Sequence, residues 1–314
     1  MLKKLLLPTT AANLHSSCRA ENNIACWRAP GRDHEPMNGV RPISHYGHSK
    51  IGTCGVCGAY GQLTWTHVPP RCAANVQAAR PLVTVPRGGG NRVISLGLEK
   101  EGGAAAYLLC RECNEDAGRW YDPEFGALWI HLAKRLLVDG EMPPPGGPYV
   151  LSIENVDPGT FVRAVLSGMM GICPTLRTQF PELQSAVQRR KLVRPPNNLF
   201  LLLALYPELD RWVAGGGSQR NVLGAGRSEP PVFAFAEYAW APLYLVLADR
   251  SGCDYWTGTT DILSWMMDRP GERRRVDLLV PVLTRDQLHS AEVHRGARQL
   301  PFPGPNGETT VWSG

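Results

Sequence analysis

Two pairs of cysteines are the residues in this sequence whose spacing predicts a specific chemistry. Cys54-Gly-Val-Cys57 and Cys110-Arg-Glu-Cys113 each place two thiols two residues apart. A tight turn at this spacing lets both sulfur atoms reach one zinc ion, and two such turns complete a tetrahedral site. A site closed by four sulfurs has no open position for water. We therefore expect a structural zinc that stabilises a small fold and does no chemistry itself.

A histidine between the two pairs is the candidate for catalysis. Residues 63–70 read Leu-Thr-Trp-Thr-His-Val-Pro-Pro, an alternation of apolar and polar residues that predicts a strand ending at His67. The two prolines that follow would stop strand pairing. An imidazole can accept a proton from water near neutral pH. Because a lone histidine is more often a surface or core residue than a catalyst, its neighbours decide the interpretation.

Asn114 follows the second cysteine pair directly. The residues after Cys113 predict a short helix that starts at the zinc knuckle. An asparagine there can cap the helix by accepting backbone N–H bonds, or it can offer its side-chain oxygen to a hard cation such as Mg²⁺. The sequence keeps both interpretations open, because one does not exclude the other.

Together these residues resemble the HNH endonucleases of the ββα-metal, or His-Me finger, type that carry a four-cysteine zinc, such as phage recombination endonuclease VII. The resemblance rests on the first CxxC, on Thr66-His67-Val68-Pro69 at a strand end, and on the second CxxC followed at once by Asn114. It implies a structural zinc on the four cysteines and a general base at His67. It also implies that Asn114 helps to hold a catalytic divalent metal, Mg²⁺ or Mn²⁺.

The implied reaction is hydrolysis of a phosphodiester bond, with DNA as the expected substrate and RNA as the alternative. This reaction needs a water deprotonated near neutral pH and a cation that neutralises charge on the phosphate and the leaving oxygen. His67 and a metal at Asn114 would supply both. The zinc would hold the strand that carries the histidine against the helix that carries the asparagine, and so would act through geometry.

Thr66 departs from the family pattern, which has Asp, Glu or His immediately before the catalytic histidine as a ligand to the catalytic metal. A neutral hydroxyl adds no negative charge and competes weakly with water for Mg²⁺. Either another acid replaces it, with Glu115 and Asp116 as candidates, or the site is weak or inactive. The alternative function is therefore a catalytically decayed zinc finger that binds nucleic acid or a protein.

The middle asparagine of the family pattern is also open, because Asn75 and Asn91 could each orient His67. The stretch between the cysteine pairs is longer than a minimal finger needs, which predicts an insertion around residues 81–101.

A third hypothesis places the function in the second half of the chain, where Trp240, Tyr244 and Trp265 are among the aromatic residues that could line a pocket.

Basic residues within the finger are candidates for phosphate contacts, and we select Arg71, Arg111 and Arg119. A solvated surface explains them nearly as well. The net charge of +5 suits a polyanionic partner but is too small to establish one. The cluster Arg273-Arg274-Arg275 could follow a nucleic-acid backbone or simply flank a strand and protect an edge.

The composition indicates compact parts with irregular connections, because 43% of the 314 residues are hydrophobic while Gly (33) and Pro (27) are numerous. We expect an α+β protein, in which a small zinc-stabilised ββα-metal finger precedes a larger α+β accessory domain. The expected segments are a disordered or loosely ordered N-terminal segment (1–48), the HNH-like nuclease domain (49–141), a Pro/Gly linker (142–149), the accessory domain (150–297) and a C-terminal tail (298–314).

In the accessory domain, Asp157-Pro158 predicts the start of a helix, and Phe161, Val162, Val165, Leu166 and Met169 follow at helical spacing. Strands are predicted at 232–238, 242–248 and 275–282, whereas 215–221 predicts a loop.

Cellular location is inferred from the same sequence. No apolar run approaches the ~20 residues that span a bilayer, and the first residues are too short an apolar run for secretion. We expect a cytoplasmic protein with no membrane partner, while the oligomeric state is not indicated.

Overall fold

The computed structural model describes the chain in the ranges 50–76, 80–87, 90–95, 102–145, 148–188, 190–208, 211–219, 232–249, 260–284, 287 and 309–313. The expected N-terminal segment 1–48 lies outside these ranges, as does most of the expected tail. Within these ranges, helices are combined with three antiparallel sheets, which confirms the α+β class.

The sheet beside the cysteine pairs has the order β1-β2-β5. Its strands are β1 (Ile51–Thr53), β2 (Tyr60–His67) and β5 (Ala105–Cys110). β2 ends at His67, as the alternation predicts, and the next two residues are joined by a cis peptide bond, Val68-Pro69. β5 leads without a break into α2 (Arg111–Asp116), so β2, β5 and α2 form a strand-strand-helix unit.

The helical segment continues beyond α2 with two π-helical stretches. It comprises η2 (Ala117–Tyr121), α3 (Asp122–Leu132) and η3 (Ala133–Val138). After the proline-rich stretch, β6 (Pro148–Val156) pairs with β11 (Arg274–Pro281) to form a two-stranded sheet.

The largest sheet has seven strands in the order β4-β3-β12-β8-β9-β10-β7. They are β3 (Arg80–Arg87), β4 (Gly90–Ser95), β7 (Leu199–Leu205), β8 (Trp212–Gln219), β9 (Val232–Trp240), β10 (Leu243–Asp249) and β12 (Thr309–Ser313). The predicted strands at 232–238, 242–248 and 275–282 are confirmed as β9, β10 and β11, within a residue or two at their ends.

Two predictions of irregular structure were wrong within the described residues. Residues 215–219, expected in a loop, lie in β8, and residues 309–313, expected in a tail, form β12 between β3 and β8. A Cβ on Gly215 would lie only 2.7 Å from the carbonyl oxygen of Ile172. The glycine that suggested a loop is therefore the residue that lets the strand lie close against a helix.

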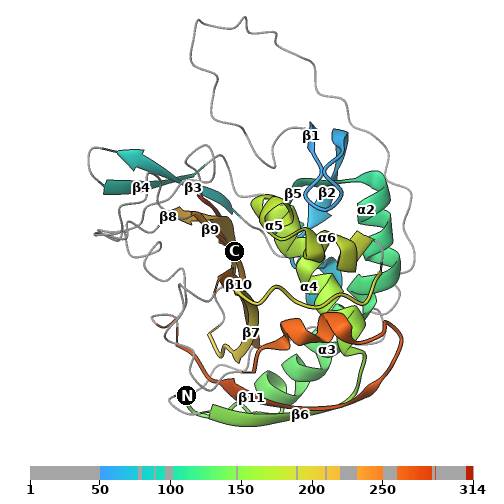
Figure 1. The fold of residues 1–314 in the computed structure, drawn as a ribbon. Coiled ribbons are helices and arrows are strands. Elements are labelled where there is room, and N and C mark those ends of the chain that lie inside the picture. The colour runs from blue at the N-terminus through green and yellow to red at the C-terminus, as the bar shows by residue number, and fades with distance from the viewer. Residues whose placement is uncertain are drawn as a thin grey trace, which may run out of the picture.

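That helix, α4 (Pro158–Ile172), is the centre of the fold. Asp157 caps it as predicted, because its carboxylate accepts hydrogen bonds from the backbone N–H (2.9 Å) and the hydroxyl (2.5 Å) of Thr160. The predicted apolar positions of α4 are all fully buried. In Figure 1, α4 lies between the seven-stranded sheet and the β1-β2-β5 sheet, with α3 below it.

Shorter helices cover the remaining faces of α4. They are α5 (Thr175–Gln179), α6 (Pro181–Gln188) and the 3-10 helix η6 (Ile262–Met267). The core joins the two halves of the chain, because one cluster of buried side chains extends from Cys54 to Leu136 and from Leu151 to Val282. The segment with the cysteine pairs therefore packs on the same core as the helices and strands that follow the proline-rich stretch.

Candidate metal centre and histidine site

The four predicted cysteines meet at one point. The sulfur atoms of Cys54, Cys57, Cys110 and Cys113 all lie within 4.8 Å of one another, and none is in a disulfide. The Sγ atoms of Cys57 and Cys110 are 3.7 Å apart. Four sulfurs placed ~2.3 Å from a central ion at tetrahedral angles would be separated by roughly 3.8 Å. The cluster could therefore hold a metal ion.

The electrostatics of this cluster favour a cation. The Cys113 thiol hydrogen-bonds to the Cys54 sulfur, which lowers the pKa of Cys54 to about 4 and raises the pKa of Cys113. Burial raises the pKa of Cys110 to about 11. Sulfur atoms this close cannot all carry negative charge unless a cation compensates them. A bound metal would provide that compensation and release the protons.

Helices from the second half of the chain hold the first cysteine turn in place. The guanidinium of Arg177, on α5, donates to the carbonyl oxygen of Cys54. Gln184, on α6, donates to the carbonyl oxygen of Cys57 over 3.2 Å. Gly55 also packs so tightly that a Cβ there would lie 2.5 Å from the carbonyl oxygen of Met170 on α4. The metal centre is thus part of the main body of the protein.

His67 is half-buried at the end of β2, opposite Ala105 of β5. Its Nε2 lies 2.8 Å from the carbonyl oxygen of Gly102. A carbonyl oxygen only accepts hydrogen bonds, so this ring nitrogen carries the proton and the other nitrogen is the basic one. Burial, together with the positive charge of Arg71, lowers the pKa of His67 below its ordinary value of 6.5, although the bond to Gly102 opposes the shift.

Asn75 closes the loop between β2 and β5. Its side-chain nitrogen donates to the carbonyl oxygens of Pro69 (2.6 Å) and Ala104 (2.9 Å), and its side-chain oxygen accepts from the N–H of Ala104 over 2.7 Å. Gly103 has φ +99°, and a Cβ there would lie 2.2 Å from the carbonyl oxygen of Asn75. Of the two asparagines left open, Asn75 therefore fixes the strand ends beside His67, whereas Asn91 lies on β4 in the seven-stranded sheet.

Asn114 is the fourth residue of α2, whose N-cap is Cys110, so the interpretation of Asn114 as the helix cap is wrong. The helix begins one turn earlier because it starts inside the second CxxC pair. Asn114 is half-buried, and within the described ranges its side chain makes no hydrogen bond. Its amide is therefore available to a ligand, although no hydrogen bond joins it to His67 in these ranges.

Thr66 is buried, with 6% of its surface exposed, and its hydroxyl donates to the carbonyl oxygen of Thr64 over 3.2 Å. Glu115 is exposed and Asp116 is half-buried. Over the described part of the chain, the four cysteines are the one group of three or more cysteine, histidine or acidic side chains placed to share a metal ion. In that part of the chain, neither Glu115 nor Asp116 belongs to a cluster of side chains that could share a metal ion.

The three arginines that the sequence suggests for phosphate contacts are all exposed: Arg71, Arg111 and Arg119. In the described ranges none of them forms an ion pair or a side-chain hydrogen bond. The cluster at 273–275 differs, because its members pair with carboxylates: Arg273 with Glu124, Arg274 with Asp268, and Arg275 with Glu154 and Asp277. The interpretation of that cluster as a strand flank is the one its contacts support.

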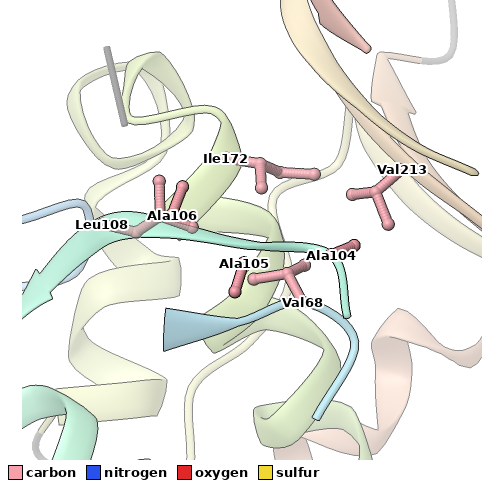
Figure 2. Close-up of a pocket in the computed structure, with 7 residues that line it drawn as sticks. All are labelled: Val68, Ala104, Ala105, Ala106, Leu108, Ile172 and Val213. Carbon is pink, nitrogen blue, oxygen red and sulfur yellow. The ribbon is translucent and has the colours of Figure 1, made fainter. Parts of the chain in front are cut away.

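An apolar recess lies between β5, α4 and β8 (Figure 2). Its lining consists of Val68, Ala104, Ala105, Ala106, Leu108, Ile172 and Val213. These side chains offer no polar group, so the recess has no means of orienting a polar ligand. The aromatic residues of the third hypothesis, Trp240, Tyr244 and Trp265, are buried in the core rather than gathered around a pocket.

Three contacts of this site could not be found from the sequence. The Gly102 carbonyl that binds His67, and Arg177 and Gln184 that hold the first cysteine turn, carry no motif. The sequence gives one local signal for these contacts, the glycine pair Gly102-Gly103. Both residues have φ +99°, a backbone conformation that glycine adopts readily.

Comparisons with protein-family models, with curated proteins and with solved structures found no match. None of the helices in the described ranges combines the length and apolar character needed to cross a membrane.

Proposed function

We propose that this protein is a metal-dependent HNH-type endonuclease that hydrolyses phosphodiester bonds in DNA, with His67 as the general base and a structural zinc on the four cysteines. The observation that carries the proposal is His67 itself. It stands at the end of β2 in a strand-strand-helix unit, with one nitrogen bonded to Gly102 and a pKa below 6.5. A histidine in that state is neutral at pH 7 and can accept a proton.

In the proposed mechanism, the unprotonated nitrogen of His67 accepts a proton from the attacking water. The bond from Nε2 to Gly102 keeps the ring oriented and stabilises the imidazolium that forms. A divalent cation held by Asn114 would neutralise charge on the scissile phosphate and the leaving oxygen. Asn75 and the cysteine cluster act through position, because they fix the strand ends and the start of α2.

The test is cleavage of supercoiled plasmid by zinc-loaded protein with and without added Mg²⁺ or Mn²⁺. We expect cleavage that requires the added cation, and a loss of about 10²-fold or more in His67→Ala, the range typical of a lost general base. His131→Ala is the matched control, because His131 is exposed on α3. Equal cleavage by wild type and His67→Ala would exclude His67 as the base.

The pH dependence of cleavage gives an independent check. The pKa of His67 is shifted downward from 6.5 because burial disfavours the charged ring. The neutral, active form should therefore persist below pH 6.5, and the acid limb of the rate profile should have its midpoint below that value. A midpoint above 6.5 would contradict the proposed environment of the base.

Thr66 favours a second candidate function, a zinc-supported module that binds nucleic acid without cutting it. Its hydroxyl already bonds within β2, and no acid cluster replaces it in the described ranges. Thr66→Asp separates the two functions. A weakened nuclease should gain cation-dependent cleavage, and Mg²⁺ should raise the melting temperature of the variant. Binding of DNA without cleavage by either form would favour the binding module.

A further inference from the structure

One face of the β1-β2-β5 sheet carries aromatic side chains in line with His67. Side chains at alternate positions of a strand share a face, so Trp65 and His67 lie on the same side of β2. Trp65 is paired across the sheet with Tyr107 of β5, and their rings meet edge to face with centroids 5.0 Å apart. His67 is paired in the same way with Ala105. The aromatic pair is therefore the next step along the surface from the candidate base.

This face also has a positive charge. The ammonium group of Lys50 lies 5.9 Å from the centre of the Tyr107 ring, and Arg71 is exposed just beyond His67. Arg71 forms no ion pair in the described ranges. Aromatic rings flanked by cations form the surface on which unpaired nucleotides bind, because bases stack on the rings and phosphates meet the cations.

Trp65 is one of two exposed tryptophans among those whose burial the structure describes. Trp129, Trp240 and Trp265 are buried, with at most 8% of their surface exposed, whereas Trp65 is 39% exposed. Trp120 is also exposed (45%), but it lies on η2 rather than on the sheet that carries His67. A cross-strand pair would stabilise the pairing of β2 with β5 equally well if it were covered. The 39% exposure of Trp65 leaves part of its surface within reach of a ligand.

We propose that the face formed by Lys50, Trp65 and Tyr107 binds an unpaired nucleotide next to the scissile phosphate, so that the substrate is single-stranded or locally unpaired DNA. This inference rests on the proposed function and names its substrate class. In a duplex the faces of the bases are hidden by stacking, so the rings would have nothing to stack on. Trp65 and His67 are two residues apart, about 7 Å along the strand. A base on Trp65 would thus place its own phosphate near the histidine.

The experiment measures binding without cleavage. Fluorescence anisotropy compares a labelled short oligothymidylate with a labelled duplex, using zinc-loaded protein without added Mg²⁺ or Mn²⁺. We expect the single strand to bind more tightly, and Trp65→Leu and Tyr107→Leu each to weaken its binding by about tenfold. Trp65→Phe, which keeps an aromatic ring, and the control Trp120→Leu should stay within about twofold of wild type.

Several results would overturn the proposal. They are equal or tighter binding of the duplex, an equal loss in Trp120→Leu, and unchanged affinity in folded Trp65→Leu and Tyr107→Leu. A concentration-dependent dimer that Trp65→Leu abolishes would assign the face to a second copy of the chain. The strand preference of the wild type tests the idea even if a variant fails to fold.

Failure of the proposed function is distinguishable from failure of this inference. His67→Ala should lose cleavage but keep its affinity for the single strand. If the wild type never cleaves but shows the expected preference and variant losses, the binding face stands and the nuclease assignment fails.

Discussion

Two regions of this molecule differ in whether their polar and charged side chains have partners within the fold. In the helical body around α4, two arginines have several partners within the fold. Arg163, which is fully buried, donates to five backbone carbonyl oxygens at 2.6 to 3.3 Å. Arg273 pairs with Glu124, which also accepts from the N–H of Asp157 over 3.0 Å. These charges are compensated within the fold.

The region around the cysteine cluster shows the opposite pattern. Arg71, Arg111 and Arg119 form no ion pair, and the amide of Asn114 forms no hydrogen bond, in the described ranges. Polar groups without an internal partner are available to something outside the chain. Charge in the body therefore serves folding, whereas we infer that charge near His67 is placed for a ligand. Substitutions in either region test one side of that contrast.

The largest effect is expected at the metal cluster. Cys113→Ser, or removal of the metal with a chelator, should abolish metal binding and cooperative unfolding, because structural zinc sites contribute on the order of 10 kcal/mol. The whole core should be affected, since the buried cluster of side chains includes Cys54 and Cys113 together with α4. Metal content and calorimetry measure both effects.

Cys72→Ser is the control for that prediction. Cys72 is buried like Cys54 and Cys113, but its sulfur donates to the carbonyl oxygen of Asp122 over 3.1 Å, a bond that serine can keep. It should retain the metal and most of the stability. Full metal content in Cys113→Ser would show that the four sulfurs do not form the site.

The second largest effect is expected at Arg163. Arg163→Met keeps the apolar stem but removes the donors to carbonyl oxygens on α4, near the ends of α6 and η6, and in the segment after α6. Unsatisfied buried groups should lower the free energy of unfolding by about 3 to 5 kcal/mol. Urea denaturation measures the change.

Arg269→Met provides the comparison, because Arg269 and its partner Glu272 are both exposed. It should change the free energy of unfolding by no more than about 0.5 kcal/mol. Similar losses in the two variants would mean that the carbonyl network around Arg163 is not what stabilises this part of the fold.

Local patterns account for what the sequence predicts of this molecule, and distant contacts for what it does not. The end of β2 at His67, the Asp157 cap and the cysteine cluster follow from residues close together in sequence or from a strong spacing motif. The bonds of Arg163 to Met266, and of Asn75 to Ala104, join residues far apart in the chain. No local periodicity encodes such pairs.

The same reasoning explains the errors. The glycines of β8 predict a loop when read locally, but the helix beside Gly215 leaves no room for a side chain there. The sequence alone does not decide whether Asn114 caps a helix or binds a metal, because it does not show that α2 begins inside the CxxC pair. The role of His67 as base, and the metal at Asn114, stay predictions.

The third prediction concerns Asp122, an acid in the body whose carboxyl group has no hydrogen bond or ion pair in the described ranges. Burial raises its pKa from 3.8 to about 7. The folded protein therefore keeps the proton at a pH at which the unfolded chain loses it. Stability should fall as pH rises from about 4 to about 7, and the loss is complete above that range.

Asp122→Asn removes this penalty, because the amide is neutral at every pH. It should stabilise the protein by about 2 kcal/mol at pH 8 and by little at pH 4. Asp277→Asn should have the opposite sign, since hydrogen bonds from Ser152 and Arg275 lower the pKa of Asp277. Melting temperatures over this pH range measure both, and a pH-independent difference for Asp122→Asn would refute the raised pKa of Asp122.

The smallest effect on stability is expected where the charges are unpaired. The double variant Arg111→Gln with Arg119→Gln should change the free energy of unfolding by less than about 0.5 kcal/mol. Its affinity for DNA should nevertheless fall. The slope of log affinity against log salt should decrease by about one for each phosphate that the variant no longer binds.

The matched control removes two charges that are paired in the structure, Arg274→Gln with Arg275→Gln. Because both double variants lose the same net charge, a general attraction between the protein and DNA would weaken equally in the two. A change in salt slope confined to the first pair would show that position, rather than net charge, determines the contact. Equal changes would remove the distinction between the two regions on which the substrate-binding interpretation of the arginines depends.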